Sequence, residues 1–321
     1  MSEIGIVIQN IVTQFIAVFG LLSNIVGFIS ISHVEFGFPA TSLLLRSQFV
    51  SDALGCIATY AYVITYTIPI SSEITNGALF ASIWASYYVL GFVCILSAMN
   101  MTLLSFDRLW AVRWFRTYRR DSKSYRITLI SVLWTYTIIL IMPTQIIAYF
   151  KYNNGLVAEN TVTMCMKINS VIIYLFAFLG PGILICLFQF GIILVLQKLK
   201  EGPGARSLNA DAITESNKGT VEQNVRAISW GIIIMLITYF VSRVYPYTDY
   251  VLSNFGLSSS STVNGWQKIQ IHMFAANFFV NPLALIFTSF SIRRWLWENI
   301  VCLKNSSWQF FSICMEKWRR I

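Results

Sequence analysis

Seven stretches of the sequence are each apolar over 20 residues or more, and this feature limits the possible folds most strongly. They lie at roughly 5–32, 42–70, 80–107, 127–150, 168–196, 227–253 and 266–289. A helix that crosses a bilayer needs about 20 such residues. Only 12% of the chain is charged, where a soluble domain carries about 25%. Because backbone polar groups in lipid must be satisfied within each segment, the sequence predicts an all-α membrane protein, a bundle of seven transmembrane helices.

The basic residues indicate how this bundle is oriented. Most of the 23 Lys and Arg residues follow the third, fifth and seventh stretches. Short loops rich in Lys and Arg stay in the cytoplasm, so we expect the N-terminus outside and the C-terminus inside. The net charge of +9 then reflects topology and attraction to anionic lipid, and no nucleic-acid partner is predicted. We expect a multi-pass protein of the plasma membrane.

The domain organisation follows from the same pattern. The bundle is predicted to occupy residues 1–289, with a polar inner loop at about 197–226 that contains Gly202, Pro203 and Gly204. Residues 290–321 are predicted to form a short amphipathic eighth helix on the inner leaflet and a cytoplasmic tail. Its apolar residues recur near helical spacing: Phe290, Trp295, Leu296, Ile300 and Val301. Cys302 and Cys314 are candidates for palmitoylation, or are simply reduced thiols.

The sequence offers little for catalysis. Its two histidines, His33 and His272, fall at opposite edges of the predicted bundle and cannot form a metal pair on one helix. There is no H-E-x-x-H motif, no G-x-S-x-G motif and no phosphate-binding glycine loop. Lys268 lies at the outer end of the last stretch, which argues against a retinal Schiff base. We therefore expect no enzyme. Paired broken helices and internal repeats, the best sequence signs of a transporter, are not found either.

Ionisable residues inside the predicted helices are the strongest candidates for function, because each costs about 2.5–3.5 kcal/mol to insert. Asp52 lies in the middle of the second stretch, and Asp107 and Arg108 lie at the inner end of the third. Buried asparagines could satisfy Asp52 without any further role. Asp107 and Arg108 could be an ordinary charge pair at the membrane interface.

Arg243 is the least usual of these residues. It could reach towards the membrane surface or pair with Asp249, although residues six apart do not share a face of a regular helix unless Pro246 bends it. Alternatively, Arg243 could receive an anionic group of a ligand or an acidic side chain from another helix.

Several landmarks occur in a fixed order, one or two in each predicted helix. They are Asn24 in GLLSNIVG, Asp52 in VSDAL, Ser97, Asp107 and Arg108 in SFDRLWAV, Trp134 and Pro143, Pro181, Phe240 and Pro246, and Asn277 with Asn281 and Pro282. With these landmarks the chain resembles the rhodopsin-like (class A) G-protein-coupled receptors over nearly its full length. LLLRSQFVSDALGC and DRLWAV are similar to segments of divergent invertebrate orphan receptors, such as those of flatworms.

The chain also departs from that family pattern. The tyrosines of the D-R-Y and N-P-x-x-Y motifs are replaced by Leu109 and Leu285, and the fifth-helix tyrosine by Gln189 or Phe190, depending on register. The C-W pair before the sixth-helix proline is Arg243 and Val244. The third-helix cysteine of the family disulfide is missing, since that region reads Ala81, Ser82 and Ile83. These replacements put in question whether the family's usual activation mechanism operates in this chain.

The resemblance implies a receptor that transduces an extracellular ligand, a small molecule or a peptide, to a heterotrimeric G protein. A transporter or channel with seven spans is the alternative. The implied polar core and activation residues are Asn24, Asp52, Ser97, Phe240, Pro246, Asn277, Asn281 and Pro282, with Pro246 as the pivot. Asp52 and Ser97, with Asn277 and Asn281, would line a sodium site, because oxygen ligands suit a hard cation. No other cofactor is implied.

Two further groups of residues follow from the resemblance. The implied G-protein-coupling residues are Asp107, Arg108, Trp110, Arg113, Trp114 and Phe115. Asp107 would hold Arg108 in the resting state, while a second lock at Arg226 would be weak because the closest acid is Glu222. The implied ligand-binding residues are Tyr62, Tyr87, Leu90, Cys94, Arg243, Tyr247 and Phe274. Leu90 stands where amine receptors carry an aspartate, which argues against a monoamine ligand.

Overall fold

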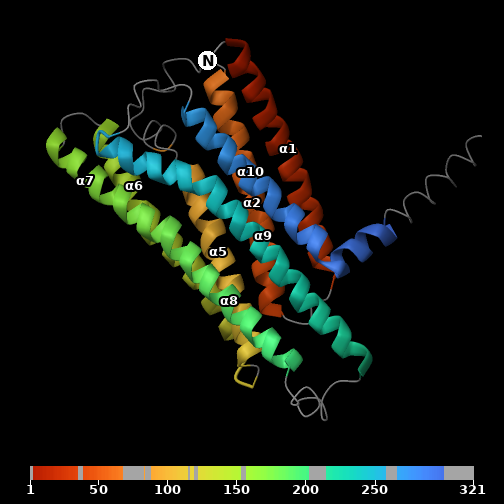
Figure 1. The fold of residues 1–321 in the computed structure, drawn as a ribbon. Coiled ribbons are helices and arrows are strands. Elements are labelled where there is room, and N and C mark those ends of the chain that lie inside the picture. The colour runs from red at the N-terminus through yellow and green to blue at the C-terminus, as the bar shows by residue number, and fades with distance from the viewer. Residues whose placement is uncertain are drawn as a thin grey trace, which may run out of the picture.

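The structure, a computed structural model, describes residues 3–34, 39–67, 83, 88–114, 116–118, 122–152, 157–201, 215–257 and 266–299. The helices are α1 (Glu3–His33), α2 (Pro39–Thr67), α5 (Tyr88–Arg113), α6 (Lys123–Tyr152), α7 (Glu159–Ile173), η1 (Tyr174–Leu179), α8 (Gly180–Glu201), α9 (Glu215–Asn254) and α10 (Trp266–Thr288). Because α7, η1 and α8 follow one another without a break, these described helices make seven rods (Figure 1). The all-α prediction is confirmed, and within the described ranges no strand is present.

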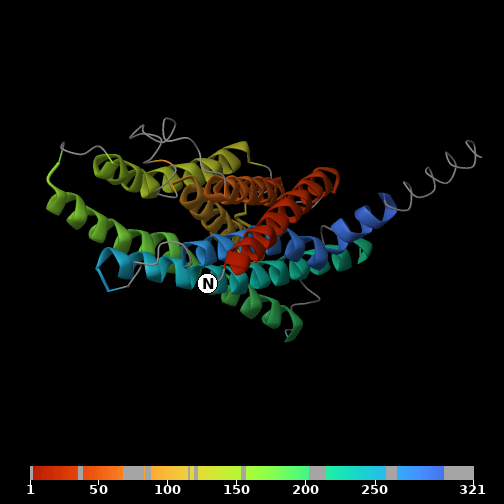
Figure 2. The same cartoon turned by 90° about the horizontal axis from the view of Figure 1, so that it is seen from above.

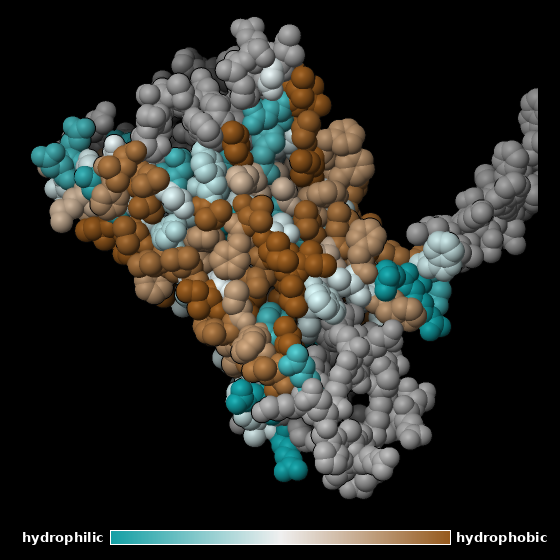
Figure 3. Space-filling view, in the orientation of Figure 1, coloured by the Kyte–Doolittle hydropathy of each residue, from teal (hydrophilic) through white to brown (hydrophobic). Residues whose placement is uncertain are grey.

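Six of the rods are long and apolar enough to cross a membrane. The exception is α2, which has 29 residues but carries Ser, Thr, Gln, Arg and Asp side chains that lower its hydropathy. Its place is explained by packing, because α2 lies against α1, α5 and α10. Apolar side chains cover most of the middle of the bundle, and polar ones gather towards its ends (Figure 3).

Four of the rods, α1, α6, α7–η1–α8 and α9, are longer than the apolar stretches that predict them. The predicted inner loop at 197–226 is too long, since α8 continues to Glu201 and α9 already begins at Glu215. Likewise α7 begins at Glu159, well before the predicted start of the fifth span. Hydropathy marks only the part of a helix that lies in lipid, whereas the backbone hydrogen bonds continue into water.

The central helix of the bundle is α5. Of its most apolar stretch 72% is buried, compared with 22% for α6, so α6 faces lipid while α5 is surrounded by protein. Seen from above, α6 and α7 lie on one side of the bundle and α1 on the other (Figure 2). Small residues allow the helices to approach closely. For example, a methyl group added at Gly55 of α2 would lie 2.6 Å from the ring of Phe278 on α10.

A π-helical turn interrupts the fifth rod just before Pro181. Proline has no N–H group and its ring clashes with the carbonyl four residues earlier, which here is that of Ala177. The N–H of Gly180 accordingly bonds to Leu175, five residues back, and the carbonyl groups of Phe176, Ala177 and Phe178 become available to side chains. Such single π turns are frequent at functional sites.

Residues 290–299 form a further helix that leaves the end of α10 at an angle (Figure 1). Ile292 and Leu296 pack against the core of the bundle, while Trp297 is exposed. Trp295 stacks on His33 at the end of α1. The predicted short amphipathic eighth helix is thus confirmed. It lies at the opposite end of the bundle from the N-terminus, as an odd number of spans requires.

Candidate functional site

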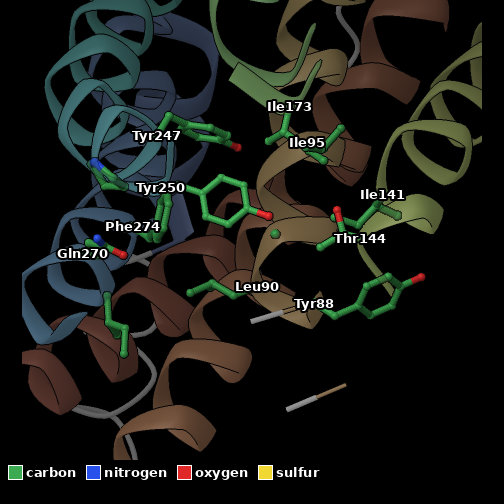
Figure 4. A pocket seen from close by; sticks show the side chains of 13 residues that line it. Tyr88, Leu90, Ile95, Ile141, Thr144, Ile173, Tyr247, Tyr250, Gln270 and Phe274 are labelled. Carbon is green, nitrogen blue, oxygen red and sulfur yellow. The ribbon is translucent and has the colours of Figure 1, made fainter. Parts of the chain in front are cut away.

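A cavity of about 140 Å³ lies in the outer half of the bundle. It lies between α5, α6, α7, α9 and α10, and its lining residues are Tyr88, Leu90, Gly91, Ile95, Ile141, Thr144, Ile173, Pro246, Tyr247, Tyr250, Gln270, Ile271 and Phe274. Tyr247, Tyr250 and Phe274 lie across from Ile141 and Thr144, and Tyr88 lies on the side of the latter two (Figure 4). No charged residue occurs among these lining residues. The described lining is therefore mostly apolar, and its polar side-chain groups are hydroxyls and an amide.

Three of the predicted ligand-binding residues line this cavity: Leu90, Tyr247 and Phe274. Tyr62, Cys94 and Arg243 are buried elsewhere in the core and are not among the lining residues, so their predicted contact with a ligand is not supported by the geometry. Tyr87 lies outside the described residues. The sequence pattern missed Tyr250 and Gln270, whose signal is their helical spacing, three after Tyr247 and four before Phe274.

An aromatic stack connects the cavity to the π turn. The ring of Tyr247 stacks on that of Phe178 at 5.6 Å, and Phe178 in turn stacks on Tyr239 at 5.9 Å. Phe240, another predicted activation residue, packs edge-on against Phe178 at 5.8 Å. The hydroxyl of Tyr239 donates to the carbonyls of Ala177 (3.0 Å) and Phe178 (2.7 Å). These contacts connect Tyr247, which lines the cavity, with the interface between α9 and η1.

Arg243 lies below this stack and is fully buried. It donates to the carbonyl of Cys94 at 2.7 Å and to Oδ1 of Asn277 at 3.4 Å, and its guanidinium lies 4.7 Å from the centre of the Tyr239 ring. The interpretation that Arg243 reaches the membrane surface is wrong, because α5 and α10 enclose it. Pairing with Asp249 is also not found among these contacts. Asp249 accepts a hydrogen bond of 2.7 Å from Gln270 instead.

Asp52 lies at the centre of a polar network. Its carboxylate accepts hydrogen bonds from Gln48 (2.9 Å), Ser97 (2.8 Å) and Asn281 (3.1 Å), all of them buried. Gln48 also donates to Ser97 at 2.7 Å and accepts from Asn100 at 2.8 Å. The predicted contacts of Asp52 with Ser97 and Asn281 are therefore present.

Two other predicted members of the core lie beside the Asp52 network without bonding to Asp52. Asn24 donates to the carbonyls of Gly20 (2.8 Å) and Phe278 (3.1 Å) and so ties α1 to α10. Asn277 accepts from Arg243. Gln48 and Asn100 were not predicted. The signal for Gln48 is its place four residues before Asp52, which puts both on one face of α2.

At the inner end of α5, four side chains converge on Asp107. Thr41 donates to its carboxylate at 2.6 Å, Tyr118 at 2.8 Å and Tyr125 at 3.1 Å, while Arg108 contacts it at 3.4 Å. Asp107 and Arg108 are both almost completely buried, so an exposed charge pair at the interface is not what forms. The two tyrosines were not predicted, because one of them comes from the loop and the other from α6.

Tyr118 is the loop member of this cluster. Its burial, and then the negative charge of Asp107, raise the pKa of its hydroxyl. The hydroxyl therefore stays protonated and donates to the carboxylate. Trp110 packs edge-on against Tyr118 and Tyr125 at 6.3 and 5.3 Å, so it supports the cluster from the side.

Among the predicted coupling residues, Arg113 is exposed and lies over the ring of Trp114 at 4.9 Å. Phe115, Cys302 and Cys314 lie outside the described residues, and the side chains of Glu222 and Arg226 are not described. The residue that replaces the family's fifth-helix tyrosine is Gln189 rather than Phe190. Gln189 is buried and donates to Ser105 at 3.2 Å, while Phe190 is exposed. Leu285 is buried where a tyrosine was expected.

The comparisons with known proteins agree with this arrangement. The family described as "7 transmembrane receptor (rhodopsin family)" matches residues 28–285, which is most of the chain. No characterised protein was found to match the sequence.

Proposed function

The chain belongs to the rhodopsin family of seven-transmembrane receptors, and from this membership we propose that it is a plasma-membrane receptor for a small uncharged ligand. The ligand occupies the outer cavity, and the partner at the inner end is a heterotrimeric G protein. The observation that carries the ligand class is the absence of charged residues among the described residues that line the cavity. A transporter or channel is not favoured, because the family match indicates G-protein signalling.

The lining chemistry supports an uncharged, largely apolar ligand. A charged ligand would have to leave water without an opposite charge to receive it, which costs several kcal/mol. Leu90, Ile95 and Ile271 instead offer apolar surface, and the hydroxyls of Tyr247 and Tyr250 offer a few directional hydrogen bonds. The volume of about 140 Å³ suits a molecule with a single ring rather than a peptide.

The coupling mechanism is a shift between two populations of the bundle. A ligand against Tyr247 and Phe274 changes how Tyr247 stacks on Phe178, and so biases the angle of α9 about Pro246, which itself lines the cavity. When the inner end of α9 moves outward, Arg108 is uncovered. An arginine suits the partner contact, because it is always charged and offers five donors in a planar fork.

The ligand class is tested with three compounds of similar size: 2-phenylethanol, 2-phenylethylamine and phenylacetate. They are applied to cells that express the receptor, with nucleotide exchange on a panel of G proteins as the readout. We expect the alcohol to change exchange at the lowest concentration. A stronger response to the amine or to the acid would overturn the uncharged class while leaving the receptor function in place.

Cavity binding is tested with a matched pair of substitutions. Leu90→Trp fills the cavity, while Leu187→Trp makes the same change on the lipid-facing side of α8, where Leu187 is 59% exposed. The first should abolish the response to the alcohol and the second should keep it. A response that survives Leu90→Trp would contradict binding in this cavity.

A further inference from the structure

We propose that Arg243 supplies the positive charge that balances Asp52 inside the bundle, so that the polar core works without a bound sodium ion. This inference goes beyond the ligand proposal and does not depend on it. Arg243 on α9 and Asp52 on α2 are the charged residues that should cost most to place inside the membrane. Both are fully buried.

The two charged groups lie about one helical turn apart in the bundle. On α5, Arg243 bonds to Cys94 and Asp52 bonds to Ser97, three residues further along. On α10, Arg243 bonds to Asn277 and Asp52 bonds to Asn281, four residues further along. One turn of helix rises 5.4 Å. Two independent helices therefore place the guanidinium and the carboxylate as neighbouring layers.

The immediate partners of Arg243 do not neutralise it. They are a carbonyl oxygen, an amide oxygen and an aromatic ring, all uncharged. Its Nε has no hydrogen-bond partner within the part of the chain that the structure describes. A buried arginine cannot lose its proton, so its charge must be balanced over a longer distance. At that distance Asp52 is the nearest acid that these contacts identify.

The other acids of the bundle are engaged elsewhere. Asp107 is ten residues from Ser97 along α5, about 15 Å at 1.5 Å per residue, and it is held by Arg108, Thr41 and two tyrosines. Asp249 lies beyond Pro246 and accepts from Gln270.

The groups around Asp52 are a poor set of ligands for sodium. A hard cation needs several oxygen atoms directed at it. Here the amides of Gln48 and Asn281 direct N–H groups at the carboxylate. Ser97 donates its own hydrogen to Asp52 and receives one from Gln48. A second cation would also meet the repulsion of Arg243. The residues therefore do not fit the sodium site that the family resemblance implies.

The first test uses the native full-length protein in lipid nanodiscs. Its unfolding temperature is measured in NaCl and in KCl at equal ionic strength. We expect the same value in both salts. A higher unfolding temperature in NaCl, which disappears in Asp52→Asn, would overturn the proposal, because it would show sodium bound at that carboxylate.

The second test is a double-mutant cycle with Arg243→Met, Asp52→Asn and the two together. Each single variant leaves one buried charge unbalanced and should lower the unfolding temperature by several degrees. The double variant should unfold at a higher temperature than either single variant. Strictly additive losses would overturn the proposal. If Arg243→Met alone yields no folded protein, Asp52→Asn is compared with the double variant. A higher unfolding temperature of the double variant supports the proposal, and a lower one overturns it.

A third measurement separates charge balance from packing. In Arg243→Met the carboxylate of Asp52 loses its balancing charge, so the unfolding temperature of this variant should rise when the concentration of either NaCl or KCl is raised. Arg293→Met, at an exposed position of the helix 290–299, is the matched control and should show a smaller rise. Equal rises in the two variants, together with additive losses in the cycle, would reduce Arg243 to a packing residue.

Discussion

The hydroxyl of Tyr239 on α9 lies 2.7 Å from the carbonyl oxygen of Phe178 and donates a hydrogen bond to it. It also donates to the carbonyl of Ala177 at 3.0 Å, whose α-helical donor would be residue 181, and Pro181 has no N–H group. Tyr136 on α6 satisfies the carbonyl of Phe176 in the same manner, at 2.6 Å. Two tyrosines from neighbouring helices thus hold the π turn, at the level where the aromatic stack below the cavity ends.

We expect Tyr239→Phe to lower the free energy of unfolding by about 1–2 kcal/mol, because it removes a buried donor that serves the carbonyls of both Ala177 and Phe178. The measurement is the thermal unfolding of the solubilised receptor. Tyr60→Phe is the control, since Tyr60 is 40% exposed on α2 and should tolerate the change. Equal unfolding temperatures for both variants would contradict the role of Tyr239 at the π turn.

Arg108→Gln should abolish ligand-stimulated nucleotide exchange while surface expression and ligand binding remain. The reason is that glutamine keeps some hydrogen-bonding capacity but loses the permanent charge and the planar fork of donors. Arg293→Gln removes the same charge from an exposed site on the same side of the membrane and should leave exchange intact. Normal exchange in Arg108→Gln would remove this residue from the coupling mechanism.

Tyr118→Phe should raise basal nucleotide exchange. Its hydroxyl is one of four groups that hold Asp107, and a less restrained carboxylate releases Arg108 more easily. Because the pKa of Tyr118 is raised above its ordinary value of 10, the hydroxyl donates at every pH below about 10, and the bond is lost only in more alkaline solution. Basal exchange should therefore not depend on pH through this group between neutral pH and pH 9. An unchanged basal rate in Tyr118→Phe would count against the restraint.

Gln48→Met should destabilise the receptor by about 1–3 kcal/mol, since it removes hydrogen bonds to Asp52, Ser97 and Asn100 together. The thermal unfolding of the purified protein is the measurement. Gln197→Met is the matched control, because Gln197 is exposed near the inner end of α8. If both variants unfold at the same temperature as the native protein, the hydrogen bonds of Gln48 do not contribute to the stability of the receptor.

The sequence alone was enough to predict a membrane protein built from helical rods. An apolar run long enough to cross lipid can satisfy its backbone only as a helix, so the hydropathy pattern alone predicted all seven rods. It placed their ends less well, as α7 and α9 show, because a helix does not stop where the lipid does. The second rod carries Gln48, Asp52 and Arg46 and is less apolar than the six clear spans, and its packing against α1, α5 and α10 explains its place in the bundle.

The residue types at the candidate sites were also visible in the sequence, but their partners were not. Asp107 was expected to hold Arg108, and it does lie beside it, yet the tyrosines that also hold it are 11 and 18 residues away along the chain. Arg243 was considered together with Asp249, six residues away. Its actual contacts are 149 and 34 residues distant.

The sequence by itself determined that this chain spans a membrane as helices and which few charged residues must be compensated, and it predicts the orientation. These are consequences of solvation, which acts on each segment separately. Only the tertiary structure decided which group compensates which, since burial removes every choice except the neighbours that packing brings within a few ångströms. For that reason Asp52 and Arg243, unrelated by any spacing along the chain, lie in adjacent layers of one polar core.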